Sequence, residues 1–381
     1  MNKTETTLAE LIKSALFGLP ANFDGDVDFN EVLKEAEAQT VVSLVQNAVP
    51  KDTAEIWHLS SAQVKAYFIR AIYEQTKLVA LLNGANIPFV IIKGTAAAIY
   101  YPTPSDRTMG DIDLLVPEEF FDDAFSLLEN SGYKFRQDYG DGRDYCFTKG
   151  GVVFELHRRY SDEGHDIEQI LKDGIKRAET LTVYGNSFPA LPKAENGLVL
   201  LDHIRHHIFG GLGLRQIIDF MMFVNSEPDD KKFESEFLPL FESAGLGTLA
   251  KVIVKTCKRY FGLPVAAAWC ETADDRTCDE LLETVFLSGN FGRKNPYVYR
   301  PMQSFTMSVK KQGFFRTLQR AGVANCKAFQ KHRILRPFAW LYQLCRYFKR
   351  GVAALFKREK LISDLSEGNR KADFYKRLGI E

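Results

Sequence analysis

The chain has 381 residues, enough for two or three domains, and its apolar and charged fractions of 45% and 26% are those of a folded globular protein. This composition excludes a disordered or fibrous chain. The 49 basic and 49 acidic residues cancel, but 14 of the basic residues and one acid, Glu359, fall between residues 310 and 360. The rest of the chain is therefore net acidic.

The N-terminus is typical of a helix rather than of a signal peptide, because Glu10 and Lys13 interrupt its apolar residues. No stretch approaches the roughly 20 apolar residues that a transmembrane helix needs. The six cysteines form no C-x-x-C pair, which is typical of reduced thiols rather than of a zinc site or a disulfide framework. We therefore expect a cytoplasmic protein without a transmembrane segment.

Residues 1–82 are expected to form an N-terminal helical region, because apolar residues recur there at spacings of three and four. Within it, the acidic run from Asp24 to Glu35 resembles a calcium loop. That loop needs glycine at its sixth position, where this chain has Phe29. We interpret the run as an acidic turn that caps a helix.

Residues 83–188 predict a small mixed β-sheet with helices. Short β-branched and aromatic runs alternate with helical patterns in the order "FVIIKG", "TAAAIYY", "RTMGDIDLLVP" and "PEEFFDDAFSLLENSGY", and the strands "YKFRQD", "DYCFTKG" and "GVVFELHRRY" follow. Thr95 is a candidate N-cap of the first helix. The order predicts an α+β core between helical regions, the C-terminal one spanning residues 189–381.

Two aspartates share one face of an otherwise apolar strand in "DIDLLV". Alternate residues of a strand point the same way, so Asp111 and Asp113 lie together while Ile112 faces the core. In "GVVFELHRRY" the same alternation places Glu155 on one face, where it becomes a third acid if the two strands pair. Such carboxylates suit divalent cations. The alternative is a strand end whose acids are merely solvated.

Positive and backbone groups lie close to these acids in the sequence. Lys93, Gly94 and Thr95 occupy a turn from strand to helix, where backbone N–H groups favour anions. Arg107 precedes Asp111 by four residues. One interpretation is phosphate binding. The other is that Lys93 and Arg107 form structural salt bridges with the aspartates and that Thr95 only caps a helix.

Together these motifs resemble the uncharacterised nucleotidyltransferase family of the DNA polymerase beta-like superfamily. The resemblance rests on "KGTAAAIYYPTPSDRTMGDIDLLVP" and "FELHRR", and "FNEVLKEAEAQTVVSL" and "LLDHIRHHIFGGLGLRQIIDFMMFV" extend it to residues 28–225. It implies a nucleotidyltransferase core, an NTP substrate, and Mg²⁺ held by Asp111, Asp113 and Glu155, the last of which also activates the acceptor. The residues that it assigns to NTP binding are Lys93, Gly94, Thr95, Arg107 and Gly110.

We therefore predict a Mg²⁺-dependent nucleotidyltransferase that transfers a nucleoside monophosphate from an NTP to a hydroxyl acceptor and releases pyrophosphate. Nothing in the sequence favours one NTP or one acceptor. Two alternatives stay open: a non-catalytic nucleotide-binding or protein-binding module of the same fold, and a protein-modifying enzyme of the toxin–antitoxin type.

Two other features have weaker claims to a function. His203 and His207 lie four residues apart but lack the glutamate of a zinc motif, so we expect packing or hydrogen bonding. The basic segment 310–360 carries large apolar residues among its charges. We favour a helix docked on the acidic remainder of this protein over binding to an anionic membrane surface or to nucleic acid.

Overall fold

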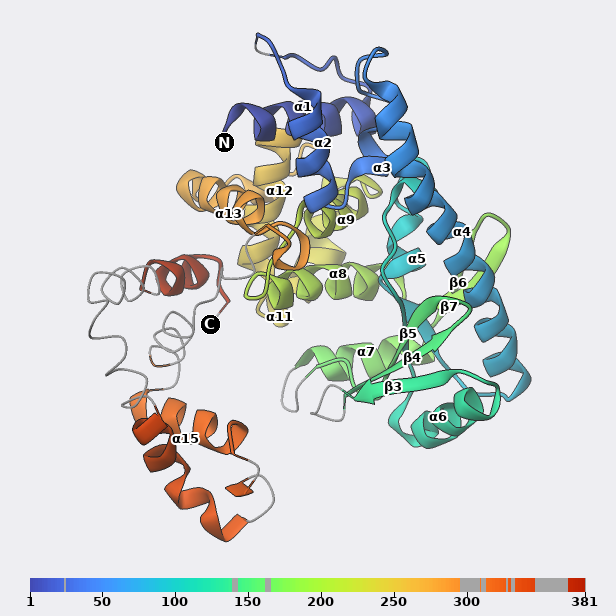
Figure 1. The fold of residues 1–381 in the computed structure, drawn as a ribbon, viewed down its shortest axis with the longest axis vertical. Helices are drawn as coiled ribbons and strands as arrows, with labels where there is room; N and C mark the ends of the chain where they lie inside the picture. The colour runs from blue at the N-terminus through green and yellow to red at the C-terminus, as the bar shows by residue number, and fades with distance from the viewer. Residues whose placement is uncertain are drawn as a thin grey trace. The chain divides into compact units, whose positions relative to one another are not determined.

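A computed structural model describes residues 1–23, 25–138, 143–161, 166–294, 309, 313–326, 328–329, 333–346 and 369–380. The chain divides into two compact units, Met1–Asn295 and Pro296–Glu381. This boundary falls inside the predicted C-terminal helical region, where no sequence pattern indicates it. The sheet lies in the first unit (Figure 1).

The sheet of the first unit has seven strands and mixed directions (Figure 1). In spatial order they are β3 (Lys134–Asp138), β4 (Asp144–Lys149), β5 (Val152–His157), β2 (Ile112–Leu115), β1 (Val90–Ile92), β7 (Asn186–Ala190) and β6 (Glu179–Val183). The pairs β2–β5 and β1–β7 are parallel, and the other four are antiparallel. A mixed sheet with helices around it confirms the predicted α+β class.

The sequence patterns did not predict β6 and β7. These strands form one edge of the sheet, and β7 pairs with β1 on its inner side. Pro189 lies inside β7, and a proline normally argues against a central strand because it cannot donate a backbone hydrogen bond. Few of the residues of β6 are apolar, so the usual strand pattern is weak there.

Helices pack on the apolar face of the sheet, where α4 (Ala54–Gly84), α5 (Gly94–Ala98) and α6 (Phe121–Asn130) contribute residues to the core. The same part of the chain also contains α7 (Asp166–Lys176) and the 3₁₀ turns η1 (Pro104–Asp106) and η2 (Glu118–Phe120). Ile112 and Leu114 of β2 and Phe154 and Leu156 of β5 are buried in one cluster with residues of α4 and α6. Because alternate residues point to opposite faces, Asp113 and Glu155 are left on the other face.

The helices expected near the N-terminus are present as α1 (Lys3–Phe17), α2 (Phe29–Ala38), α3 (Val42–Val45) and α4. The acidic turn caps a helix as predicted. The side chain of Asp28 accepts hydrogen bonds from the backbone N–H groups of Asn30 and Glu31, at 2.9 and 3.4 Å. Asp24 lies outside the described residues.

A second group of helices follows the sheet in the first unit. These are α8 (Lys193–His207), α9 (Leu214–Asn225), α10 (Asp230–Lys232), the π-helix η3 (Phe233–Phe237), α11 (Leu238–Ser243), α12 (Gly247–Phe261), η4 (Ala268–Cys270), α13 (Asp275–Ser288) and η5 (Asn290–Gly292). Helices α8 and α9 approach closely at Gly197, where an added Cβ would lie 2.2 Å from Cζ of Phe223. Only glycine fits at this contact.

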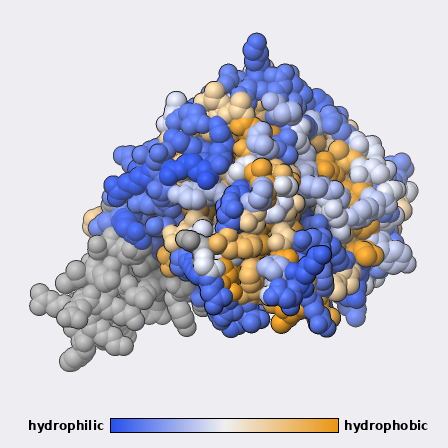
Figure 2. All heavy atoms as spheres, turned by 90° about the horizontal axis from the view of Figure 1, so that it is seen from above, coloured by the Kyte–Doolittle hydropathy of each residue, from blue (hydrophilic) through white to orange (hydrophobic). Residues whose placement is uncertain are grey.

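Exposed apolar residues occur on the surfaces of both units. Figure 2 shows a mainly hydrophilic face, seen from the side of α1 and the start of α4, with several separate hydrophobic areas. Among the exposed large apolar side chains are Ile56 and Leu59 of α4. These two residues lie three positions apart and line one pocket on the surface of the first unit.

The second unit contains α15 (Phe314–Ala324) and η6 (Arg333–Phe338). Much of the basic segment, including residues 310–312 and 347–360, lies outside the described residues. Docking of this segment on the protein therefore stays a prediction. Across the described ranges, no helix combines the length and the apolar character needed to cross a membrane.

Candidate active site

Strand pairing brings Asp113 and Glu155 side by side. The parallel register of β2 and β5 sets these two residues opposite each other. On the other side of β2, the antiparallel register sets Ile92 of β1 beside Asp113. Only 2% of Asp113 is exposed. A carboxylate removed from water in this way needs charged or hydrogen-bonding partners.

Lys93 supplies one of these partners. Its Nζ lies 2.7 Å from Oδ1 of Asp113. Burial disfavours both charges, but their mutual attraction raises the pKa of Lys93 and keeps the pKa of Asp113 well below its ordinary value. The backbone of Lys93, at φ 53° and ψ −133°, is in a region that residues other than glycine rarely adopt. Strained backbone of this kind is concentrated at functional sites.

His157 supplies the second partner of Asp113. Its Nε2 lies 2.9 Å from Oδ1 of Asp113, and its Nδ1 lies 2.6 Å from Oδ1 of Asp144. Burial favours the neutral ring, but hydrogen bonds to the two carboxylates raise the pKa of His157 to about 9. At neutral pH both ring nitrogens therefore donate. In this state His157 donates to Asp113 and fixes its orientation.

Asp111, Asp113 and Glu155, which we call the acidic edge, lie close together and close to the cations Lys93, His157 and Arg215. Burial, followed by the charge of Asp113, raises the pKa of Asp111. Burial and both aspartates raise the pKa of Glu155 to about 7. Among the described residues, the group whose ligand atoms all lie within 4.8 Å of one another is Asp113, Glu155 and His157. Asp111 precedes β2 and is not part of this group, so its place among the metal ligands stays a prediction. Because carboxylate oxygens are the ligands that hard divalent cations prefer, the acidic edge fits a divalent metal ion.

The side chain of Thr95 points away from the acidic edge. Thr95 is fully buried, and its hydroxyl donates to Oε1 of Gln75 on α4 at 2.7 Å. The expectation that Thr95 is a helix N-cap is wrong. Helix α5 begins at Gly94 with Lys93 in the N-cap position, and no side chain caps it.

Arg107 forms a buried ion pair with a residue of α9. Only 3% of it is exposed. Its Nε donates to Oδ1 of Asp219 at 2.8 Å, and its Nη2 donates to Oδ2 at 2.7 Å. The salt-bridge interpretation of Arg107 is thus realised, but with Asp219 rather than with Asp111 or Asp113.

The two predicted glycines border the segment that leads to Asp111. A Cβ on Gly94, whose φ is 31°, would lie 3.2 Å from Cε of Met109 and 3.5 Å from the carbonyl oxygen of Asp111. The carbonyl oxygen of Gly110 accepts a hydrogen bond of 2.6 Å from the hydroxyl of Tyr67. Both glycines therefore lie beside the acidic edge.

Helix α9 contributes Arg215, a residue that sequence reasoning missed, and helix α8 carries the two histidines that it singled out. Arg215 of α9 donates from Nη1 to the carbonyl oxygen of Thr108 at 3.0 Å. His203 and His207 of α8 pack edge to face, with ring centroids 4.3 Å apart. Burial, followed by the charges of Lys93 and Arg215, lowers the pKa of His207 to about 3. The histidine pair therefore packs as neutral rings, as expected.

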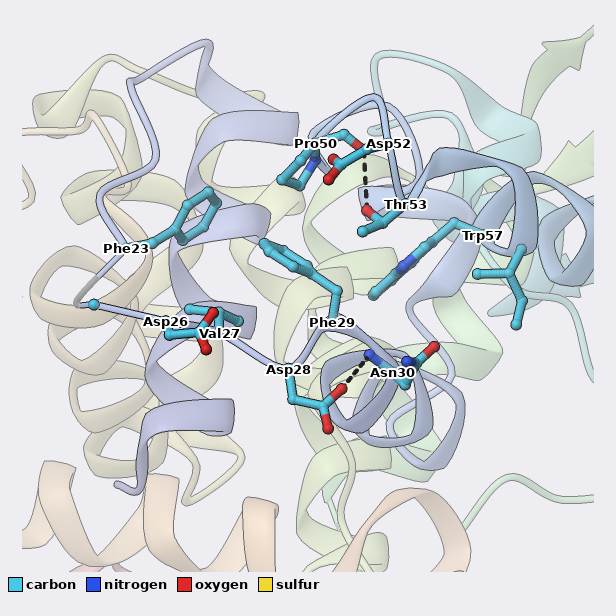
Figure 3. A pocket seen from close by; sticks show the side chains of 12 residues that line it. Phe23, Asp26, Val27, Asp28, Phe29, Asn30, Pro50, Asp52, Thr53 and Trp57 are labelled. Carbon is cyan, nitrogen blue, oxygen red and sulfur yellow. Dashed lines mark hydrogen bonds between the residues drawn. The ribbon is translucent and has the colours of Figure 1, made fainter.

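A separate cavity of about 450 Å³ lies near the start of α2 and α4 (Figure 3). It is lined by Phe23, Phe29, Trp57 and several polar residues, and the rings of Phe23 and Phe29 meet edge to face at 5.5 Å. One lining carboxylate, Asp28, already caps α2. The cavity shares no lining residue with the acidic edge, so we assign the chemistry to the acidic edge instead.

Residues 26–262 match the family model described as uncharacterised nucleotidyltransferase. The chain belongs to this family. The matched residues include the whole sheet, the acidic edge, and helices α8 and α9. The predicted family is therefore confirmed, and the chain is a nucleotidyltransferase. A comparison with curated proteins gave no match.

Two solved structures are similar to parts of this nucleotidyltransferase. ANT(2")-Ia in complex with adenylyl-2"-tobramycin is 17% identical, with a TM-score of 0.31, over 42% of this chain and 91% of that one. An antigenic nucleotidyltransferase-like protein from Paracoccidioides brasiliensis is 16% identical, with a TM-score of 0.30, over 51% of this chain and 97% of that one. Likeness at these TM-scores supports no conclusion about substrates.

Proposed function

We propose that this chain is a Mg²⁺-dependent nucleotidyltransferase that transfers a nucleoside monophosphate from an NTP to a hydroxyl acceptor. The observation that carries the proposal is the placement of Asp113 opposite Glu155, with Lys93 and His157 both bonded to Asp113. Carboxylates with cationic side chains beside them suit a reaction in which a metal ion and a polyphosphate are bound together.

The reaction forms one bond and breaks one. The acceptor oxygen bonds to the α-phosphorus, the bond from that phosphorus to the oxygen that bridges to the β-phosphate breaks, and pyrophosphate leaves. Mg²⁺ bound by Asp111, Asp113 and Glu155 would supply positive charge near the attacking and leaving oxygens. Lys93 and His157 hold Asp113 ionised and fix its orientation.

Glu155 is the proposed acceptor of the hydroxyl proton. A general base works best when its pKa lies near the working pH. In the protein without a metal ion, burial and the neighbouring aspartates raise the pKa of Glu155 to about 7, and Mg²⁺ bound to the same carboxylates would lower it. The proposed role therefore rests on the position of Glu155 opposite Asp113, where its carboxylate would accept the proton of an acceptor hydroxyl that approaches the metal.

The proposed phosphate contacts come from Lys93, Gly94, Thr95 and Gly110. Gly94 and Gly110 border the acidic edge, and Lys93 contacts it directly. Because the hydroxyl of Thr95 bonds to Gln75, we assign Thr95 a contact through its backbone N–H only. Arg107, also predicted to bind NTP, is proposed to act indirectly through its pair with Asp219, which fixes the segment before Asp111.

The test follows label from the α-phosphate of each NTP. Purified protein is incubated with Mg²⁺, one of the four α-labelled NTPs, and a cell extract as the source of acceptor, and both pyrophosphate and labelled product are measured. We expect wild type to release pyrophosphate in step with product. Asp113→Asn and Glu155→Gln are expected to lose both by at least about 100-fold. Arg276→Gln on the surface of α13 is the matched control.

Two results would overturn the proposal. One is wild-type protein that yields no labelled product with any of the four NTPs. The other is equal product formation by wild type, Asp113→Asn and Glu155→Gln. Label that ends on the protein itself identifies a protein hydroxyl as the acceptor and leaves the roles of the acidic edge unchanged.

A further inference from the structure

Arg215 carries a buried positive charge without an acidic partner. Only 7% of it is exposed. Its one hydrogen bond joins Nη1 to the carbonyl oxygen of Thr108, and its Nε has no partner. Among the described residues, no carboxylate oxygen lies within 4.0 Å of the guanidinium. Asp219, one helical turn further along α9, is engaged by Arg107 and by the hydroxyl of Tyr101.

The guanidinium of Arg215 borders the acidic edge. Thr108 and Gly110 lead directly to Asp111, and a Cβ on Gly110 would lie 3.8 Å from Nη1 of Arg215. The charge of Arg215 also acts on the Asp111 carboxyl, where it favours ionisation. A buried unpaired cation is costly to keep. A bound anion would give this guanidinium the partner that the protein does not supply.

Phe291 presents an exposed ring next to Arg215. Its centroid lies 5.7 Å from the guanidinium carbon, and it meets the ring of His207 edge to face at 4.8 Å. The side chain is 53% exposed although it is large and apolar. One part of the ring is therefore packed against the site, and the remainder is open to a ligand.

The turn that carries Phe291 is strained and held in place. Phe291 has φ 54°, which a bulky residue rarely adopts. Its backbone N–H donates to the carbonyl oxygen of Gly211 at 3.0 Å, and a Cβ on Gly211 would lie 2.1 Å from the backbone nitrogen of Gly292. The close approach of two glycines thus fixes the ring in position. Strain kept in this way is concentrated at ligand-binding sites.

We propose that Arg215 and Phe291 bind the NTP, with the guanidinium of Arg215 on a phosphate oxygen and the open face of Phe291 stacked on the nucleobase. This inference rests on the proposed function, and it assigns nucleotide binding to two residues that follow the acidic edge in the sequence, one on α9 and one on η5. A guanidinium matches phosphate oxygens with paired N–H donors. An aromatic ring stacks on any base, so it adds affinity without selecting one NTP.

The test measures binding rather than turnover. Calorimetric titrations with ATP, GTP, CTP, UTP and inorganic tripolyphosphate are carried out at fixed free Mg²⁺ on the full chain. The variants are Arg215→Met, Arg215→Lys, Phe291→Leu and Phe291→Trp, with Arg276→Met on α13 as the control for loss of an arginine. Thermal unfolding of each variant checks that it is folded.

Arg215→Met is expected to weaken binding of both NTP and tripolyphosphate by at least tenfold, and Arg215→Lys by a smaller factor. Phe291→Leu is expected to weaken NTP binding by at least fivefold and to leave tripolyphosphate unchanged, while Phe291→Trp keeps the affinity. Because Arg215 has no ion pair to lose, Arg215→Met should leave the melting temperature within a few degrees of wild type. A residue that only supports the fold would show the opposite pattern.

The outcomes separate this inference from the proposed function. Wild type that binds NTP while Arg215→Met and Phe291→Leu bind it equally well overturns the inference alone. Wild type that binds neither NTP nor tripolyphosphate overturns both. If Arg215→Met does not fold, Arg215→Lys decides, since unchanged affinity for tripolyphosphate in a folded lysine variant contradicts the role of the guanidinium fork.

Discussion

Two buried aspartates in the first unit hold cations in different ways. Asp219 of α9 uses both carboxylate oxygens: Oδ1 accepts from Tyr101 and Arg107, and Oδ2 accepts from Arg107. Asp113 of β2 is equally buried, but Lys93 and His157 both bond to Oδ1, and two further acids lie beside it. The pair at Asp219 is compensated and structural. At the acidic edge, burial and the crowding of acids raise the pKa values of Asp111 and Glu155, an arrangement that suits a metal site.

The largest effect on stability is expected from the compensated pair. Arg107→Met would leave Asp219 buried without its cation, and removing one partner of a buried ion pair costs about 3–5 kcal/mol. Urea unfolding measures the change in the free energy of unfolding. The matched control is Arg215→Met, which breaks no ion pair and should cost about 1 kcal/mol. Equal losses in the two variants would contradict the distinction between these arginines.

The next effect concerns the acidic edge and depends on pH. The pKa of His157 is raised to about 9 in the folded protein, so its protonation adds to the free energy of unfolding. This stabilisation is fully present below about pH 6.5, the ordinary histidine pKa, and is lost as the pH rises through about 9. It amounts to about 3 kcal/mol at most.

The free energy of unfolding of wild type and His157→Gln, measured from pH 7.5 to 9, tests this directly. This window lies above the pKa of about 7 of Glu155, so the two groups do not overlap strongly. Wild type should lose more stability across the window than His157→Gln. Parallel curves for the two proteins would show that His157 is not held protonated by Asp113 and Asp144.

The smallest effect separates packing from substrate binding at Thr95. Thr95→Val removes the hydroxyl that donates to Gln75 and is expected to cost about 1–2 kcal/mol of unfolding free energy, with Thr95→Ser as the control that keeps the hydroxyl. Calorimetric affinity for tripolyphosphate should be unchanged in both variants. A loss of that affinity in Thr95→Val alone would place the hydroxyl in phosphate binding.

Local patterns predicted the parts of the site that depend on strands. The alternation in "DIDLLV" and in "GVVFELHRRY" indicated which side chains leave the core, and the register of β2 and β5 then places Asp113 opposite Glu155. The mixed sheet and the nucleotidyltransferase family were also predicted. These features depend on residues close together in the sequence or on motifs that other family members carry.

Contacts between distant segments could not be predicted in this way. Arg107 and Asp219 are 112 positions apart, and nothing in either segment specifies the other. Thr95 satisfied every local rule for an N-cap, but its hydroxyl instead donates a hydrogen bond to the buried side-chain amide oxygen of Gln75. Arg215 gave no signal at all, because an arginine on a helix is ordinary until the fold shows that it is buried and that no described residue forms an ion pair with it.

The most direct test compares Asp113→Asn with Asp219→Asn. Pyrophosphate release from NTP with cell extract is measured per folded molecule, with the folded fraction taken from urea unfolding of each variant. We expect Asp113→Asn to fold and lose at least about 100-fold of the wild-type rate. Asp219→Asn should be less stable but keep the rate of its folded fraction within about tenfold of wild type. Wild-type rates in folded Asp113→Asn would contradict the central claim that the acidic edge carries the chemistry.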